Sequence, residues 1–317
     1  MQNLTYQIQN IMKLILTALS FAVLLASPMQ AQDYVFKVLA NKGGNTVKVA
    51  DHSTEWEPIR TGATLNGNDE LHISQDSYIG LVHASGKTVE LKNEGNYYVR
   101  DLAAKLGNTK SSVASKYANF VINKMTSDDD QDINKNHREY LTVTGAVERS
   151  VLDAPISLKM PSSVEVLNEQ ALIRWDKVED AEGYIFTVRN MYDEVILTKE
   201  LTSPQILLEL AKAPVNSEEL VIINVQVKGN KELYSGNYGI KRLTGVDADP
   251  ILKELDQLSV SLKDETSLNK LILATFFEEN NLLIDALMNY EKAVQLSPDV
   301  EQFKIAYDLF TKRNGLQ

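Results

Sequence analysis

The sequence predicts a multidomain, mainly β protein with an α-helical C-terminus, and three observations support this fold class. Apolar and polar residues alternate in short segments from about residue 34 to 99, which is the pattern of half-buried strands. A second series of short alternating segments, separated by turns, runs from about 154 to 243. From about residue 249 onward, apolar residues recur at intervals of three and four, which is the spacing of amphipathic helices.

Length, charge and composition are those of a globular chain. At 317 residues, the chain is long enough for two or three domains, each with its own core. The net charge is −11 and Lys and Arg are not clustered, so we expect no nucleic-acid partner. The sequence has no cysteine, which excludes disulfides and cysteine-based catalysis.

Residues 1–31 have the pattern of a signal peptide. Lys13 precedes the apolar run 14–26, and Ala31 supplies a small residue before a cleavage site. The alternative is a membrane anchor, but the run is shorter than the roughly 20 residues that span a bilayer. We therefore expect export to the periplasm, with secretion as the alternative, and no transmembrane span.

The first predicted β domain covers residues 33–106. Its strands are separated by turns at Gly62, Gly67 and Gly86, where positive φ is expected. The run Trp56-Glu57-Pro58-Ile59, the turn around Gly67-Asn68-Asp69 and the alternating segment 77–91 resemble the exported FecR-type β domain. That resemblance implies an envelope β domain and supplies no catalytic site.

Residues 107–150 read as a helix followed by an acidic linker. The helix is expected over about 101–125, where Val113, Tyr117, Phe120 and Val121 have helical spacing. Five oxygen-bearing side chains in the linker occupy ligand positions of a helix–loop–helix calcium site: Asp128, Asp130, Asp132, Asn136 and Glu139. Ile133 stands where such a loop needs glycine, so a solvated linker is the preferred interpretation and calcium the alternative.

Residues 151–245 contain seven candidate strands, the first of them at 156–160, and these predict an antiparallel β-sandwich. Trp175 and Tyr184 are expected on its inward faces. The segments Ile173-Arg174-Trp175-Asp176 and 181–188 resemble a fibronectin type III or related immunoglobulin-like module.

Residues 246–317 are predicted to be helical, with Asp249 or Pro250 at the start of the first helix. Small and aromatic residues in 267–298 follow the order of a tetratricopeptide repeat, and their helical frame is Leu273, Ala274, Phe277, Ala286, Tyr290 and Ala293. The alanines let two helix backbones approach, while the larger side chains fill the space beside them. Lys270 departs from the repeat, which usually has a large aromatic there; a plain helical bundle and a dimerisation hairpin are the alternatives.

The sequence contains no clear motif for catalysis or metal binding. His52, His72, His83 and His137 are scattered, and the pair His72 and His83, on neighbouring predicted strands, lacks a third zinc ligand. No nucleophile elbow or phosphate-binding glycine loop is present in the sequence. We therefore predict neither enzyme activity, nor a cofactor, nor a metal site.

These observations predict a non-catalytic exported scaffold or adaptor that binds a protein partner in the cell envelope, through a groove of the helical segment. A carbohydrate- or peptidoglycan-binding protein that uses Trp56, Tyr97 or Tyr98 is the first alternative, so glycan contact is possible. A hydrolase with an unmarked carboxylate pair is the second.

Overall fold

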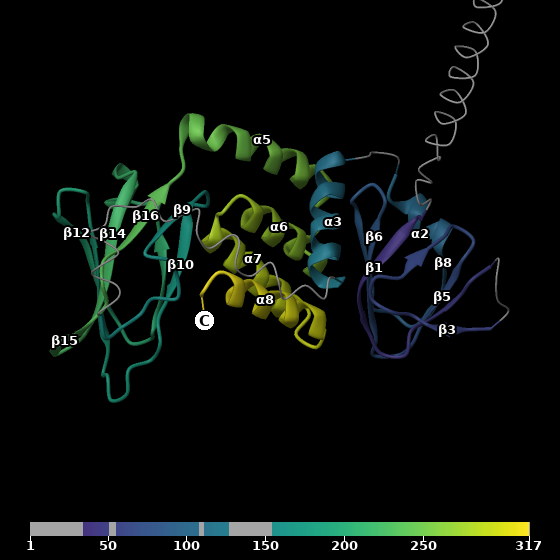
Figure 1. The fold of residues 1–317 in the computed structure, drawn as a ribbon, viewed down its shortest axis with the longest axis horizontal. Helices are drawn as coiled ribbons and strands as arrows, with labels where there is room; N and C mark the ends of the chain where they lie inside the picture. Colours follow the sequence, from purple (N-terminus) through teal and green to yellow (C-terminus); the bar gives the residue numbers. More distant parts are fainter. Residues whose placement is uncertain (1–33, 51–54, 108–110, 127–153, 317) are drawn as a thin grey trace, which may run out of the picture. The chain divides into compact units, whose positions relative to one another are not determined.

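The structure, a computed structural model, describes residues 34–50, 55–107, 111–126 and 154–316. The predicted signal peptide and the acidic linker with its five calcium candidates lie outside these residues. From Val35 onward, the described residues belong to one compact unit. Within the described residues, every strand ends by Arg242 and the chain from Gly245 onward is helical, which confirms the predicted β-then-α layout (Figure 1).

The first β region forms two four-stranded sheets, with strand orders β4-β1-β6-β7 and β3-β2-β5-β8. All pairings in them are antiparallel. The strands are β1 (Phe36–Lys42), β2 (Thr46–Lys48), β3 (Glu57–Pro58), β4 (Thr64–Leu65), β5 (Glu70–Ile73), β6 (Tyr78–His83), β7 (Thr88–Leu91) and β8 (Gly95–Tyr98). Phe36, Val38, Leu71 and Leu81 belong to the buried core of this region.

The second β region has two sheets that enclose one core. The larger sheet has the order β12-β11-β14-β16-β9, with β15 also paired to β14, and the smaller is the pair β10-β13. The strands are β9 (Ser163–Val166), β10 (Gln170–Arg174), β11 (Tyr184–Arg189), β12 (Val195–Leu201), β13 (Gln205–Glu209), β14 (Leu220–Val227), β15 (Asn230–Tyr234) and β16 (Tyr238–Arg242). Trp175 and Tyr184 are buried there, with ring centroids 5.3 Å apart.

Two predictions for this region are wrong in detail. The expected first strand, 156–160, makes only isolated bridges, at Ile156 and Leu158. The unpredicted strand β9 pairs with β16 in parallel, so the sheets are not wholly antiparallel. Leu158 bridges to Trp175, which follows β10 of the smaller sheet. The chain then crosses to the larger sheet, where β9 runs beside β16 in the same direction.

The helices differ from expectation mainly at their ends. They are α2 (Val99–Lys105), α3 (Ser112–Thr126), α5 (Gly245–Ser261), α6 (Ser267–Glu279), α7 (Leu283–Leu296) and α8 (Glu301–Arg313), with a short 3-10 turn η3 (Val215–Ser217). The helix expected near 101–125 is therefore α2 and α3. Helix α5 begins at Gly245 and not at Asp249 or Pro250. Pro250 lies inside the helix and has no N–H, so the one hydrogen bond that is lost is the bond to the carbonyl of Val246, an exposed residue, and the helix tolerates this loss.

Strands β1 and β6 are buried on both faces. On one face, Phe36, Val38 and Leu81 join the core between the two sheets. On the other face, Leu39, Tyr78 and Val82 join a larger core made with α3 and α5–α8. Gly80 lies where a Cβ would touch the side chain of Leu268, so its lack of a side chain lets α6 pack directly on the sheet.

We predict that Gly86→Ala destabilises the protein more than Gly229→Ala. Both glycines have positive φ (85° and 82°), so alanine at either costs about 1–2 kcal/mol of backbone strain. A Cβ at Gly86 would also overlap the backbone of Ala114 and Ser115 at the start of α3, whereas Gly229 has open space.

Urea unfolding of the two variants measures the difference. We expect Gly86→Ala to lose roughly 3 kcal/mol or more of unfolding free energy, since overpacking adds about 1–3 kcal/mol to the strain. Equal losses would contradict close packing of α3 on the β6–β7 turn.

Candidate functional site

The predicted helical frame lies in a buried helix pair. Helices α6 and α7 pack against each other, joined by a turn in which Asn281 has φ of 57° (Figure 1). The side chain of Thr266 caps α6 by accepting a hydrogen bond from the Asn269 N–H. The predicted frame residues Ala274, Phe277, Ala286, Tyr290 and Ala293 are buried, and Leu273 packs against the same core.

Helix α6 is covered by other parts of this chain. The ring of Tyr117 on α3 meets Phe276 edge-on, with centroids 5.1 Å apart. From β7, the Glu90 carboxylate accepts a hydrogen bond of 2.9 Å from the Leu268 N–H, and Thr88 donates one to Asn269. Because most residues of α6 are buried, this helix offers no open face to a partner in the described structure.

Helix α7 joins the helices to the second β region. The buried Asp285 accepts hydrogen bonds from the backbone N–H groups of Leu167 (3.0 Å) and Asn168 (2.9 Å), between β9 and β10. Further along α7, Glu291 forms an ion pair with Arg174 of β10. On another side, the ring of Tyr290 stacks on Phe310 of α8, with centroids 4.6 Å apart. The helix pair therefore contacts both β regions.

A polar cluster centres on Glu278, where four helices meet. Its carboxylate accepts hydrogen bonds from Arg313 of α8 (2.9 Å) and from the Tyr290 hydroxyl of α7 (2.7 Å), and it lies 3.2 Å from Lys124 of α3. Burial raises the pKa of Glu278, but Lys124 and Arg313 outweigh burial and hold the pKa below its usual value. The cluster thus keeps a buried carboxylate ionised by pairing it with two cations.

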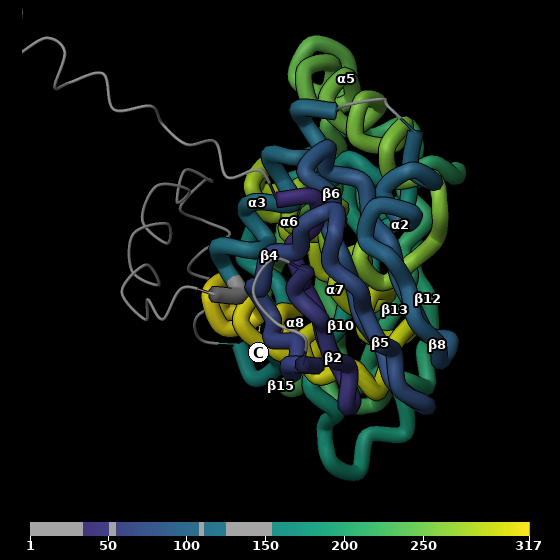
Figure 2. The backbone as a smooth tube through the Cα atoms, turned by 90° about the vertical axis from the view of Figure 1, so that its right-hand side faces the viewer, coloured from purple at the N-terminus to yellow at the C-terminus, as the bar shows by residue number. Residues whose placement is uncertain are grey.

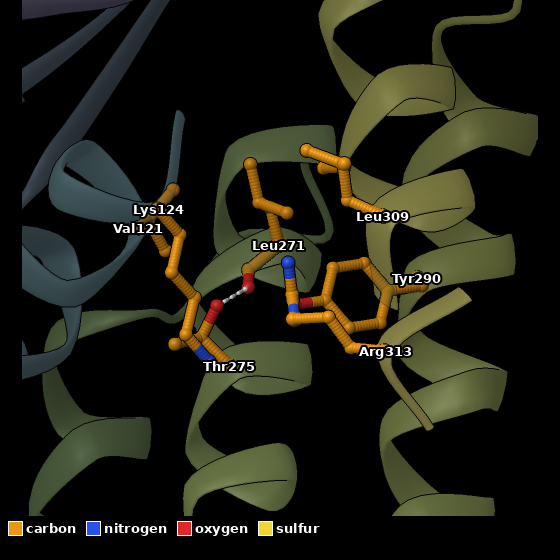
Figure 3. Close-up of a pocket in the computed structure, with 8 residues that line it drawn as sticks. Val121, Lys124, Leu271, Thr275, Tyr290, Leu309 and Arg313 are labelled. Atoms are coloured by element: carbon orange, nitrogen blue, oxygen red, sulfur yellow. Dashed lines mark hydrogen bonds between the residues drawn. The ribbon is translucent and has the colours of Figure 1, made fainter. Parts of the chain in front are cut away.

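A small cavity lies beside this cluster. Figure 3 shows Lys124, Thr275, Tyr290 and Arg313 around it, with Val121, Leu271 and Leu309 as apolar lining. Its volume is about 10 Å³, which is room for about one water molecule. The cavity is therefore too small for an organic substrate.

The histidine pair does not form. His72 lies on β5, and His83 lies at the end of β6 in the other sheet, so they are not on neighbouring strands as predicted. His72 is hydrogen-bonded to Asn96 (2.7 Å), and His83 packs edge-on against Phe36. Across the described ranges, no group of three His, Asp or Glu side chains is placed to hold a metal ion.

The aromatic residues proposed for glycan contact are divided by the fold. Trp56, just before β3, and Tyr98, at the end of β8, are exposed. Tyr97 points to the other side of β8 and packs against the core. Only Trp56 and Tyr98 are therefore available to a ligand.

An exposed apolar group that was not predicted from the sequence lies at the turn between β11 and β12. Met191 is 64% exposed, Tyr192 76% and Val195 58%. The sequence does contain a signal for this group, which is the pair Met191-Tyr192 between the turn-forming residues Asn190 and Asp193. Large apolar side chains in a short turn do not reach the core, so they indicate a binding surface.

No protein-family model matches the chain, and a search of curated proteins finds no match. Within the described residues, no helix combines the length and apolar character needed to cross a bilayer.

We predict that Glu278→Gln destabilises the fold and that Glu279→Gln, its neighbour, does not. Removing one partner of a buried ion pair leaves the other charges uncompensated, at a cost of roughly 2–4 kcal/mol here, because Lys124 and Arg313 are partly exposed. Glu279 pairs with Lys124 at a more exposed site, so its loss should cost under about 1 kcal/mol. Denaturant unfolding of both variants tests this, and equal losses would contradict it.

We predict that the stability of the folded protein depends on pH through the carboxyl group of Asp285. Burial raises its pKa to about 6, against hydrogen bonds from the backbone that lower it. Because the folded state binds this proton more tightly than the unfolded state, the contribution is fully present below pH 3.8 and is lost as pH rises through about 6.

The comparison is between the wild type and Asp285→Asn, unfolded in denaturant from pH 4 to pH 7. The stability of the wild type relative to the variant should fall by roughly 2 kcal/mol over this range. A difference independent of pH would show that Asp285 does not titrate there.

Proposed function

We propose that the protein is a non-catalytic exported scaffold of the cell envelope that binds a protein partner. The predicted signal peptide supports export to the periplasm. In this proposal the first β region is a FecR-like domain, the second an immunoglobulin- or fibronectin-like sandwich, and the last a tetratricopeptide-like segment.

The helical segment acts in this proposal as the internal support of the scaffold. Its frame residues are buried, and its polar contacts go to β7 through Glu90 and to the β9–β10 turn through Asp285. A partner would consequently bind on a β surface and not in the predicted groove of the helix pair.

The observation that carries the proposal is the ordered turn between β11 and β12. The buried side chain of Asn190 accepts hydrogen bonds from the N–H groups of Tyr192 and Glu194, each 3.0 Å long. Its amide also donates to the Glu194 carboxylate at 2.8 Å. This network holds the turn while Met191 and Tyr192 point away from the core, and an ordered exposed aromatic loses little entropy on binding.

The adjoining strand supports the same surface. Among the described strands, β12 is the last in its sheet and pairs only with β11. An edge strand of this kind can pair with an extended segment of a partner, while Met and Tyr are enriched in protein interfaces. We therefore place the partner site at Met191, Tyr192, Val195 and the free edge of β12.

A photo-crosslinking amino acid at position 192 of the mature protein tests the proposal. We expect one discrete crosslinked protein, and the matched control is the same amino acid at Val260, which is 61% exposed on α5. Asn190→Ala should weaken the product at position 192 by loosening the turn, and Met191→Ser should weaken it by removing an apolar contact.

The same product from positions 192 and 260, or none from 192 while the whole chain captures a partner, would refute this site. Deletion of residues 249–317 would not test the partner site, because Tyr78 and Val82 of the first β region share a core with these helices. Their exposure would disturb the fold as well as any binding.

A further inference from the structure

The sheet β3-β2-β5-β8 has an outer face that carries polar and aromatic side chains. Figure 2 shows two of its strands, β5 and β8, side by side. Because side chains alternate along a strand, the registers place two rows outward while Val47, Leu71 and Ile73 point to the core. One row is Pro58, Thr46, His72 and Asn96. The other is Lys48, Glu70 and Tyr98, with Trp56 immediately before β3 at its far end.

Both aromatic rings on this face are held by a neighbour while remaining open to solvent. The ring of Trp56 meets His72 edge-on at 5.8 Å and is 41% exposed. The guanidinium of Arg100 lies 5.1 Å from the ring centroid of Tyr98, which is 45% exposed. Three strand spacings separate the two ends of this row, so the backbones of Trp56 and Tyr98 lie roughly 14 Å apart, and the Trp56 ring extends from β3 toward His72 of β5.

The charges on this face balance. Lys48 and Glu70 are cross-strand partners, and Arg100 pairs with Asp101 at 3.8 Å. A balanced face gives no electrostatic preference for an anionic polymer such as nucleic acid or for a charged lipid surface. The two outward rows also contain no Val, Leu, Ile or Met, which makes them unlike the apolar centre of a protein interface.

We propose that this face binds a neutral, linear oligosaccharide. Trp56 and Tyr98 would stack on the apolar faces of two sugar rings, since an aromatic ring provides a large flat apolar surface. Between them, Lys48, Glu70, His72 and Asn96 carry the hydrogen-bond donors and acceptors that match sugar hydroxyls. The site is independent of the proposed protein site on β12, because it lies on the other β region.

The intrinsic fluorescence of the mature protein provides a direct assay. The chain has two tryptophans, and Trp175 is buried, so a change on adding ligand reports on Trp56. The probes are a tetramer of β-1,4-linked glucose and a tetramer of β-1,4-linked N-acetylglucosamine, which differ in their acetamido groups. We expect saturable binding of at least one of them.

Variants locate the site. Tyr98→Ala should weaken binding about tenfold or more, as the loss of one stacked ring is expected to do. Trp56→Ala, followed by calorimetry because it removes the fluorophore, should have the same effect, and Trp56→Phe should restore part of it. The matched control is Tyr234→Ala, which removes a tyrosine that is 48% exposed on β15 and should leave binding unchanged.

If neither tetramer binds at concentrations up to about 10 mM, the proposal is overturned. Equal binding by the Trp56→Ala, Tyr98→Ala and Tyr234→Ala variants would also overturn it, since the saccharide would then sit elsewhere. The crosslinking result at position 192 does not affect this outcome, so the two proposals can fail separately.

Discussion

Strands β1 and β6 are buried on both faces, and this double burial joins the first β region to the helices. One face completes the core between the two sheets of the first β region, and the other supplies Leu39, Tyr78 and Val82 to the core of the helices. Gly80 makes this possible, because a larger residue would meet Leu268. The helices therefore complete the core of a β-sheet and do not form a separate body.

Shared burial changes the role of the helical hairpin. The small and aromatic residues that suggest a repeat do bring two helices together, yet their surroundings are filled by α3, α8 and β7. Buried polar groups mark the same junctions. Glu278 joins four helices, and Asp285 binds the backbone between β9 and β10. These carboxylates are held by cations or N–H groups in structural arrangements, unlike the opposed pair that a hydrolase needs.

The two surfaces that we propose for binding lie on the β regions. They share a property that the helical frame lacks, which is an aromatic side chain that is both exposed and held in place. Tyr192 is positioned by the hydrogen bonds of Asn190, and Tyr98 by the cation of Arg100. Their neighbours differ, with apolar residues and a strand edge around Tyr192 and balanced charges around Tyr98. This difference is the reason why we propose a protein partner for the first surface and a saccharide for the second.

The local elements could be predicted from the sequence, because alternation and helical spacing are properties of neighbouring residues. It located the strands around Glu70 and Tyr184, the helices around Ala274 and Tyr290, and the turns at Gly62 and Gly86. It did not determine the parallel pairing of β9 with β16, the separation of His72 from His83, or the enclosure of α6. These features, and the placement of Trp56 and Tyr98 on one face of a sheet, follow from tertiary packing, because each depends on residues far apart in the chain that meet only when the sheets form.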